Sequence, residues 1–333
     1  MTTSTVIHKS IDVITTSQWE KLLDTDTINF FQTPKALNFF MTVGWETFTF
    51  ASENEGEINV LISGIIQKEK GLKSVISSRA IIYGGPVIAK TATANDLTDV
   101  LKELIHYLQK KVIYIETRNF NDYETWKSTF KKSGFEYHPH LNFHVDCSEE
   151  TRMRKQMSSS KVRQVKKSLK AGAEIVEATT RTEVEAYYAI LENLYKTKVK
   201  TPLPDVSFFV KMWETQAAKF LLVSYQNQVI GGIICPVLTN KVIYEWYVCG
   251  KDGMYKNIYP SILATWAAMD YAVKHNIPRF DFMGAGKPDQ DYGVREFKSK
   301  FGGKQVAHGR FLKVTKPLLY KIGKKAVEIL KNS

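Results

Sequence analysis

The sequence predicts an α/β protein of two similar domains that arose by internal duplication, each with a sheet flanked by helices. Apolar strand, helix, turn glycine and strand follow one another in residues 112–145 and again after residue 279. The same interval of 168 residues separates the matching positions, which are Tyr114 and Phe282, Gly134 and Gly302, His140 and His308, and Phe143 and Phe311. A chain of 333 residues is also at the upper limit of what one core holds.

The two copies set the expected domain boundaries. The last strand of the first copy ends near Cys147, and a basic tract begins after Thr151. We therefore expect a first domain of residues 1–147, joined by the tail 312–333, and a second domain of residues 148–311. Only the second copy carries the glycine bend at Gly284 and Gly286, so it is the expected location of the active site.

Local signals predict each element in order. Ser17 is a candidate helix cap, Pro34 suits a first helical turn, and the segment Tyr83-Gly-Gly-Pro86 predicts a corner after antiparallel strands. Apolar residues spaced by three and four predict a buried helix over residues 95–109. The further expected elements are helices at 182–196, 207–218 and 261–275, strands near 219–225, 229–238, 241–249 and 279–283, and an amphipathic tail at 316–330.

Composition limits the class of protein and its compartment. A hydrophobic content of 44% indicates a globular chain, and apolar stretches such as Val229–Leu238 are too short to span a bilayer. The amino terminus shows no secretory signal pattern, and three cysteines without metal spacing are expected to be reduced and structural. These observations predict a cytoplasmic protein.

The net charge of +12 favours an anionic partner, and one tract concentrates that charge. Residues 152–170 hold eight basic residues and no acidic one. The tract predicts a helix that contacts phosphate groups of nucleic acid, of a phosphorylated carrier or of an anionic membrane, with the candidates Arg154, Lys161, Arg163, Lys166 and Lys167. The alternative is a solvated helix face in which Val162, Val165 and Leu169 pack inward.

A glycine bend between a strand and a helix is the strongest candidate site. In Gly284-Ala-Gly-Lys287-Pro, glycines allow close backbone approach, and exposed N–H groups beside a lysine can bind an anion. Arg295 and Lys298 follow three residues apart on one helix face. The alternative is a basic amphipathic helix that buries Phe297 and Phe301.

Other chemistries lack support in the sequence. There is no P-loop, G-x-G-x-x-G, H-E-x-x-H or G-x-S-x-G motif. His138, His140 and His144 alternate as though on one face of an edge strand, with no cysteine or acidic partner nearby. We therefore predict neither a metal site nor a tightly bound cofactor.

Several motifs together resemble the Fem family of aminoacyltransferases, which build peptidoglycan interpeptide bridges. The resemblance rests on Phe31-Gln-Thr-Pro, on Arg79 to Pro86, on Ser160 to Gly172, and on the stretch from Asp281 to Gly303 that includes Tyr292-Gly-Val and Phe297-Lys. It spans nearly the whole chain. It implies two tandem domains of the GNAT type, each with a mixed, mostly antiparallel sheet whose central strands splay apart.

The resemblance implies an enzyme that moves an aminoacyl group from aminoacyl-tRNA to an amine of a peptidoglycan or other, possibly lipid-linked, cell-envelope precursor. Phe297 would position the substrate, and Lys298 would stabilise the developing oxyanion. Glu245, Asp281 or the substrate itself would serve as base. The splay would lie between residues 242–248 and 279–283. The expected substrate-binding residues are Tyr83, Tyr244, Tyr247, Gly284, Gly286, Lys287, Tyr292 and Arg295.

Departures from the family pattern keep alternatives open. Ala36 and Phe40 stand where the family often has a tryptophan and a lysine that hold the precursor, and the chain is too short between Thr182 and Ala218 for a long helical arm. One alternative is an N-acyltransferase that uses a coenzyme A thioester; another is a non-catalytic RNA-binding or phosphate-binding module. The tail after Lys316 suits either an anionic membrane surface at the inner face of the membrane or docking on the first domain.

Overall fold

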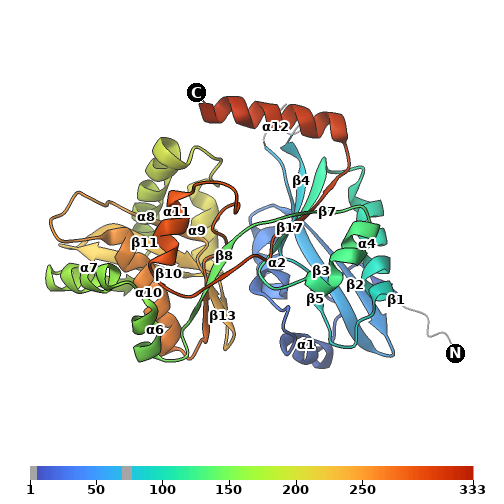
Figure 1. Ribbon diagram of the computed structural model, residues 1–333, viewed down its shortest axis with the longest axis horizontal. Helices are drawn as coiled ribbons and strands as arrows, with labels where there is room; N and C mark the ends of the chain where they lie inside the picture. The colour runs from blue at the N-terminus through green and yellow to red at the C-terminus, as the bar shows by residue number, and fades with distance from the viewer. Residues whose placement is uncertain (1–5, 70–76, 333) are drawn as a thin grey trace. The chain divides into compact units, whose positions relative to one another are not determined.

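The computed structural model describes residues 6–69 and 77–332, with side chains as far as residue 325. The chain forms two compact units, one from Met1–His140 with His308–Ser333 and the other from Leu141–Ala307 (Figure 1). Both units combine mixed sheets with helices, as the sequence predicts. Among the described residues, no helix has the length and apolar character needed to cross a membrane.

The first unit is built on one sheet with the strand order β1-β2-β3-β4-β6-β17-β7, and β5 pairs with β3. Its strands are β1 Val6–His8, β2 Glu46–Asn54, β3 Glu57–Gln67, β4 Arg79–Gly84, β5 Val87–Ile88, β6 Tyr114–Asn119, β7 Glu136–His138 and β17 Arg310–Val314. Its helices are α1 Thr16–Leu23, η1 Phe30–Gln32, α2 Pro34–Thr42, α4 Ala94–Leu108, η3 Glu124–Trp126, α5 Lys127–Lys132 and α12 Pro317–Asn332.

Helix α4 covers one face of this sheet and buries the predicted apolar stripe. It begins at a capping box in which the Thr93 hydroxyl accepts from the Asp96 N–H and the Asp96 carboxylate accepts from the Thr93 N–H. Pro34 starts α2 as predicted. The predicted N-cap of α1 was wrong by two residues, because Thr15 caps the helix rather than Ser17.

The second unit holds two smaller sheets, ordered β14-β11-β10-β9 and β12-β13-β15-β8-β16. Its strands are β8 Asn142–Asp146, β9 Glu174–Glu177, β10 Lys219–Tyr225, β11 Gln228–Cys235, β12 Val237–Leu238, β13 Val242–Tyr244, β14 Tyr247–Gly250, β15 Arg279–Asp281 and β16 Lys304–Val306. Its helices are α6 Glu150–Gln156, α7 Ser159–Lys170, α8 Arg181–Leu194, η4 Tyr195–Val199, α9 Val206–Glu214, α10 Pro260–Lys274 and α11 Gly293–Ser299.

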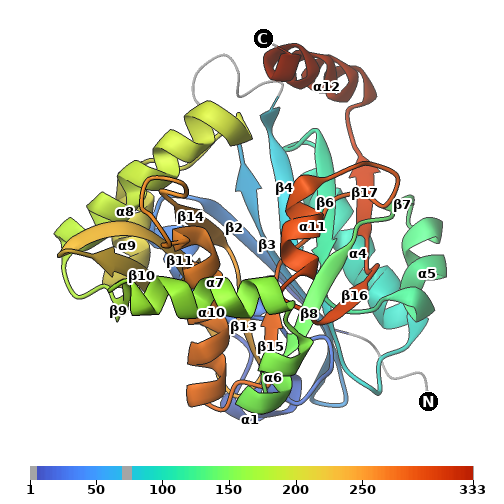
Figure 2. The ribbon, with the colours of Figure 1, turned by 60° about the vertical axis from the view of Figure 1, so that its left-hand side comes forward.

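Helices cover both faces of these sheets. Helices α7 and α10 lie side by side and share a core with β10, β11, β13, β15 and β8 (Figure 2). Helices α8 and α9 pack on each other, and α8 also packs on β11 and β14. The three cysteines, Cys147, Cys235 and Cys249, are buried and free, as predicted.

The two halves of the chain exchange a strand. β8 follows the first half in sequence but pairs with β15 and β16 in the second unit, while β17 follows the second half and pairs with β6 and β7 in the first. In Figure 2 the green β8 therefore lies beside the orange β15. The unit boundaries fall at residues 140/141 and 307/308 rather than at 147/148 and 311/312.

The exchange also corrects the expectation for the histidines. His138 lies in β7 of the first unit and His144 in β8 of the second, so the histidine series does not share one strand. Alternation along the sequence misled here because the chain passes from one sheet to the other near His140.

Gly303 gives a test of the exchanged strand. Its φ is +89°, and a Cβ atom there would lie 2.5 Å from the backbone oxygen of His144 in β8. We expect Gly303→Ala to lower the free energy of unfolding by about 2 kcal/mol, because strain and the backbone clash add. Urea unfolding measures the change. Gly293→Ala is the control, since a Cβ there meets no atom within 4 Å; equal effects at both positions would contradict the assignment.

Candidate active site

Between β13 and β14 the chain of the second unit passes from one sheet to the other. β13 runs parallel to β15, and its register continues until the Glu245 N–H donates to the Asp281 carbonyl at 2.9 Å. The next N–H, that of Trp246, donates instead to Ile234 of β11 at 3.0 Å. β14 and β15 therefore separate after Glu245, between the strands where the sequence predicts the splay. Side chains at this point lie at the junction of the two sheets.

Glu245 and Lys298 form a buried ion pair at the junction. Lys298 Nζ lies 2.9 Å from Glu245 Oε1, and the two side chains are 11% and 3% exposed. The same Nζ donates to the carbonyl oxygens of Phe282 and Gly284, at 2.8 Å each. Three oxygens thus use the three N–H bonds of the ammonium group. Lys298 ties α11 to the backbone that follows β15.

Burial raises the pKa of Glu245, although the charge and hydrogen bond of Lys298 and the hydroxyl of Thr265 act against this shift. The nearby Asp281 carboxylate raises it further. Among the described contacts, Oε2 of Glu245 accepts no hydrogen bond, and it is inaccessible to solvent. A buried carboxyl group with a raised pKa and an unused oxygen is suited to accept a proton near neutral pH.

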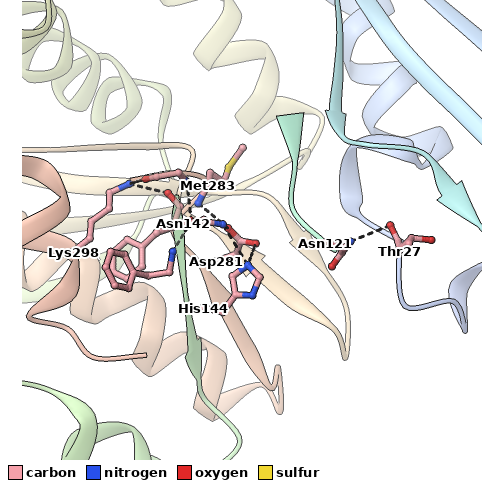
Figure 3. A network of polar contacts seen from close by, with 10 residues as sticks. Thr27, Asn121, Asn142, His144, Asp281, Met283 and Lys298 are labelled. Atoms are coloured by element: carbon pink, nitrogen blue, oxygen red, sulfur yellow. Dashed lines mark hydrogen bonds and ion pairs between the residues drawn. The ribbon is translucent and has the colours of Figure 1, made fainter. Parts of the chain in front are cut away.

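Asp281 is held in a different way. Its Oδ1 accepts from the Asn142 side chain and the Met283 N–H, at 2.7 Å each, and its Oδ2 lies 3.0 Å from His144 Nε2 (Figure 3). Burial would raise the pKa of Asp281, but His144, Arg279 and Asn142 together hold it below its ordinary value. Asp281 is therefore a fixed anion that positions strand β8 and the bend after β15.

The glycine bend is not an anion cradle, which corrects the sequence-based expectation. The N–H of Gly284 donates to Asn142 Oδ1 at 2.8 Å, and the N–H of Ala285 donates to the Leu141 carbonyl at 2.6 Å. The bend offers its carbonyl groups to cations instead. Lys298 binds those of Phe282 and Gly284, as described above, and Arg295 binds those of Ala285 and Lys287.

The other predicted residues of this segment surround the bend. Lys287 and Tyr292 are exposed, and a Cβ atom on Gly286 would lie 2.8 Å from the Tyr292 ring. Glycine is required there because its φ is +79°. Lys287 is the predicted cation that remains at the surface beside the bend, while Arg295 and Lys298 hold it in shape.

The predicted phosphate-binding residues fall into two groups. Lys161 is buried, with Nζ 4.1 Å from the centre of the Phe297 ring, and Arg154 lies 4.1 Å over Trp266 while it pairs with Glu150. Burial, together with the nearby Lys300 charge, lowers the pKa of Lys161 to about 8. Lys161 is buried against an aromatic ring, so the expectation that it faces a phosphate is wrong. The side chain of Arg154 is 38% exposed, and its predicted phosphate contact stays a prediction.

The other predicted phosphate-binding residues are exposed to solvent. Arg163, Lys166 and Lys167 are exposed, and together with Lys170 and Val162 they line a shallow hollow of about 480 Å³ on α7. Val165 is buried and Leu169 is 45% exposed, so the apolar side of this helix is only partly covered. One charged face remains as a candidate surface for phosphates.

Glu245, Asp281 and Lys298 lie in a segment that matches a protein-family model. Residues 214–327 match the FemAB family. The predicted resemblance to the Fem family is confirmed, and with it the prediction of an acyltransferase. No curated protein matches the chain in sequence.

Solved structures show the same fold outside this segment. FemX is 13% identical, with a TM-score of 0.68 over 95% of this chain and 99% of FemX. L-PGS from Bacillus licheniformis is 13% identical, with a TM-score of 0.55 over 88% and 96%. A tandem GNAT protein from the clavulanic acid biosynthesis pathway is 8% identical, with a TM-score of 0.56 over 94% and 99%. The prediction of two tandem GNAT-like domains is confirmed at the level of fold.

The tyrosines predicted from the Fem resemblance differ in exposure. Tyr244 in β13 is fully buried. Tyr247 in β14 is half-buried and packs edge-on against Phe209, with ring centres 5.0 Å apart. Tyr83 lies in β4 of the first unit, so it does not belong to the polar network of the second.

Asn142 and His144 were missed by motif reasoning within the FemAB segment, because they lie in the first half of the sequence. The interval of 168 residues could have found them. It matches Asn142–Asp146 with Arg310–Val314, and both stretches are the exchanged strands.

The buried pair predicts a stability effect. We expect Lys298→Met to lower the free energy of unfolding by about 3 kcal/mol, because it leaves the Glu245 carboxylate without a countercharge. Adding Glu245→Gln should recover part of this loss, with a coupling on the order of 2 kcal/mol in urea unfolding. Lys300→Met is the control, since its pair with Glu296 is exposed and screened by solvent, and its loss should leave stability nearly unchanged. Additive effects of the two substitutions would contradict a buried pair.

Proposed function

We propose that this protein transfers an aminoacyl group from aminoacyl-tRNA to an amine of a cell-envelope precursor, with the reaction centre at the sheet junction of the second unit. The observation that carries the proposal is the buried Glu245–Lys298 pair within the FemAB segment. The likeness in fold to FemX and to L-PGS agrees with it. No tightly bound cofactor is needed, because the donor is already an activated ester.

The reaction needs one proton to move twice. The neutral acceptor amine attacks the ester carbonyl, and the base takes a proton from its nitrogen as the carbon–nitrogen bond forms; the carbon–oxygen bond to the tRNA ribose then breaks. The same proton passes to the departing ribose oxygen. An amide and a free hydroxyl group result, so the base is regenerated.

Glu245 suits the role of base better than Asp281. Burial raises the pKa of Glu245, whereas His144, Arg279 and Asn142 outweigh burial at Asp281 and lower its pKa. In the described structure Oε2 of Glu245 accepts no hydrogen bond, and Oδ2 of Asp281 is held by its 3.0 Å ion pair with His144. Lys298 keeps the Glu245 carboxylate charged and in place. To stabilise an oxyanion as well, Lys298 would exchange one of its carbonyl partners for the substrate. Phe297, which precedes Lys298 on α11, completes the predicted catalytic set.

The coenzyme A alternative has less support. In acetyltransferases of this fold the pyrophosphate is cradled at the start of the helix that corresponds to α10. Here the Asp252 carboxylate accepts from the Ser261 N–H at 3.1 Å and from the Ser261 hydroxyl. An acidic group at that helix terminus opposes a pyrophosphate.

The basic face of α7 and the tail complete the proposed contacts. Arg163, Lys166 and Lys167 would contact the tRNA backbone. In α12, Tyr320 packs edge-on against Tyr114, while Leu318 and Ile322 are 77% and 54% exposed. Such exposed apolar residues among lysines suit the surface of an anionic membrane, where a lipid-linked acceptor resides.

A pH profile tests Glu245. We expect the single-turnover rate of transfer from charged tRNA to an amine-bearing muropeptide to rise with pH through the raised pKa of Glu245, because only the carboxylate accepts a proton. Glu245→Gln should lower the rate at least a hundredfold and remove this acid limb. Titration of the acceptor amine persists in both proteins and serves as the internal reference. An unchanged acid limb in Glu245→Gln would assign the base elsewhere.

Ligand binding tests the donor. We expect charged tRNA to bind with an affinity that falls with salt, and the triple variant Arg163→Gln/Lys166→Gln/Lys167→Gln to reduce the slope of log K against log salt by about 2. The control triple variant Arg181→Gln/Lys196→Gln/Lys211→Gln removes the same charge from exposed ion pairs of α8, η4 and α9. Saturable binding of acetyl-coenzyme A without tRNA would favour the thioester-dependent enzyme, and equal effects of both triple variants would remove α7 from the tRNA contact.

A further inference from the structure

The first unit holds a polar cluster where the exchanged strand β17 meets β6. Glu116 bridges two arginines, with Oε2 2.8 Å from Arg118 Nε and Oε1 3.0 Å from Arg310 Nη1. Arg310 Nη2 lies 3.1 Å from His140 Nε2. Because arginine only donates, His140 must accept at Nε2 and is neutral in this contact. The two arginines and one carboxylate leave an excess of one positive charge.

The sheet register places the two guanidinium groups side by side. Arg118 pairs with Arg310 across β6 and β17, and with Tyr83 across β6 and β4, so the three side chains share one face of the sheet. Like charges directly opposite each other destabilise a sheet. Burial and the Arg118 charge lower the pKa of Arg310, although Glu116 opposes this shift. The pair of arginines therefore lowers the stability of the fold.

Arg118 is prepared to bind a further oxyanion. Glu116 fixes its Nε, and its guanidinium carbon lies 5.3 Å from the centre of the Tyr83 ring. Among the described contacts neither terminal nitrogen of Arg118 donates a hydrogen bond, and the side chain is 31% exposed. Two N–H groups of a fixed guanidinium match the two oxygens of a carboxylate or phosphoryl group.

We propose that Arg118 and Arg310 form an oxyanion-binding site in the first unit, with Glu116 as the group that orients both guanidinium groups and Tyr83 as the aromatic support of Arg118. The ligand is a small molecule, or part of one, that presents a phosphoryl or carboxylate group. The proposal does not depend on transfer chemistry in the second unit. It gives the first copy of the duplication a binding role at the strand position that corresponds to Asn142 in the second.

Isothermal titration of the whole chain with inorganic pyrophosphate, phosphate and acetate, at constant ionic strength in chloride, tests the site. We expect saturable binding by the wild type, and at least tenfold weaker binding by Arg118→Gln. Arg118→Lys keeps the charge beside Glu116 and so protects the fold, but it should also weaken binding because the fork is lost. Stronger binding of pyrophosphate and phosphate than of acetate would assign a phosphoryl ligand, and the reverse a carboxylate ligand.

Two controls separate this site from other basic surfaces. Arg181→Gln removes an equal charge from an exposed ion pair and should leave the affinity unchanged. The triple substitution Arg163→Gln/Lys166→Gln/Lys167→Gln on α7 should also leave it unchanged. The proposal is overturned if no anion binds, if Arg118→Gln binds like the wild type with a wild-type melting midpoint, or if the α7 variant loses the binding.

Discussion

The exchange of one strand between the two halves of the chain is the constraint on which both polar clusters depend. β8 lies between β15 and β16, so Asn142 and His144 reach Asp281 from the other half of the sequence. β17 likewise brings Arg310 to Glu116. A fragment that began after residue 147 would lack Asn142 and His144, and would leave the buried Asp281 carboxylate with the Met283 N–H as its remaining described hydrogen bond. The two sequence halves are therefore not independent folding units.

In the second unit, the buried charges of Lys298 and Glu245 stabilise a break between the two sheets. Between β13 and β14 the chain leaves β15, and backbone groups beyond β15 lose their strand partners. Lys298 binds the carbonyls of Phe282 and Gly284 instead. Lys298 needs a countercharge at that depth, and Glu245 supplies it. The same carboxylate carries an oxygen without a hydrogen bond in the described structure, so the group that stabilises the break is also the one that we propose as the base.

The sequence predicted the helices and strands well, but it did not show which side chains contact one another in the fold. Turn glycines, caps and apolar spacing predicted the helices and most strands, and the interval of 168 residues predicted the duplication, because local physics determines these features. The role of Lys161 was mispredicted, since a run of basic residues does not show which of them is buried against an aromatic ring such as Phe297. The glycine bend was misread for a related reason. Its N–H groups are used by Asn142 and Leu141, which the exchange delivers from another part of the chain.

Comparison of the two units explains why only one of them suits transfer chemistry. At the matching position of the exchanged strand, the second unit has the neutral Asn142 and the first has Arg310. The neutral amide of Asn142 binds both the Asp281 carboxylate and the Gly284 N–H. At the neighbouring break in the sheet, burial removes Glu245 from water and raises its pKa. In the first unit β4 and β6 stay paired from Arg79 to Gly84, and burial of Glu116 is outweighed by Arg118 and Arg310, which lower its pKa to about 2. Such a carboxylate is a poor base at neutral pH but orients cations well, which agrees with the proposed anion-binding role of the first unit and with the proposed reaction centre in the second.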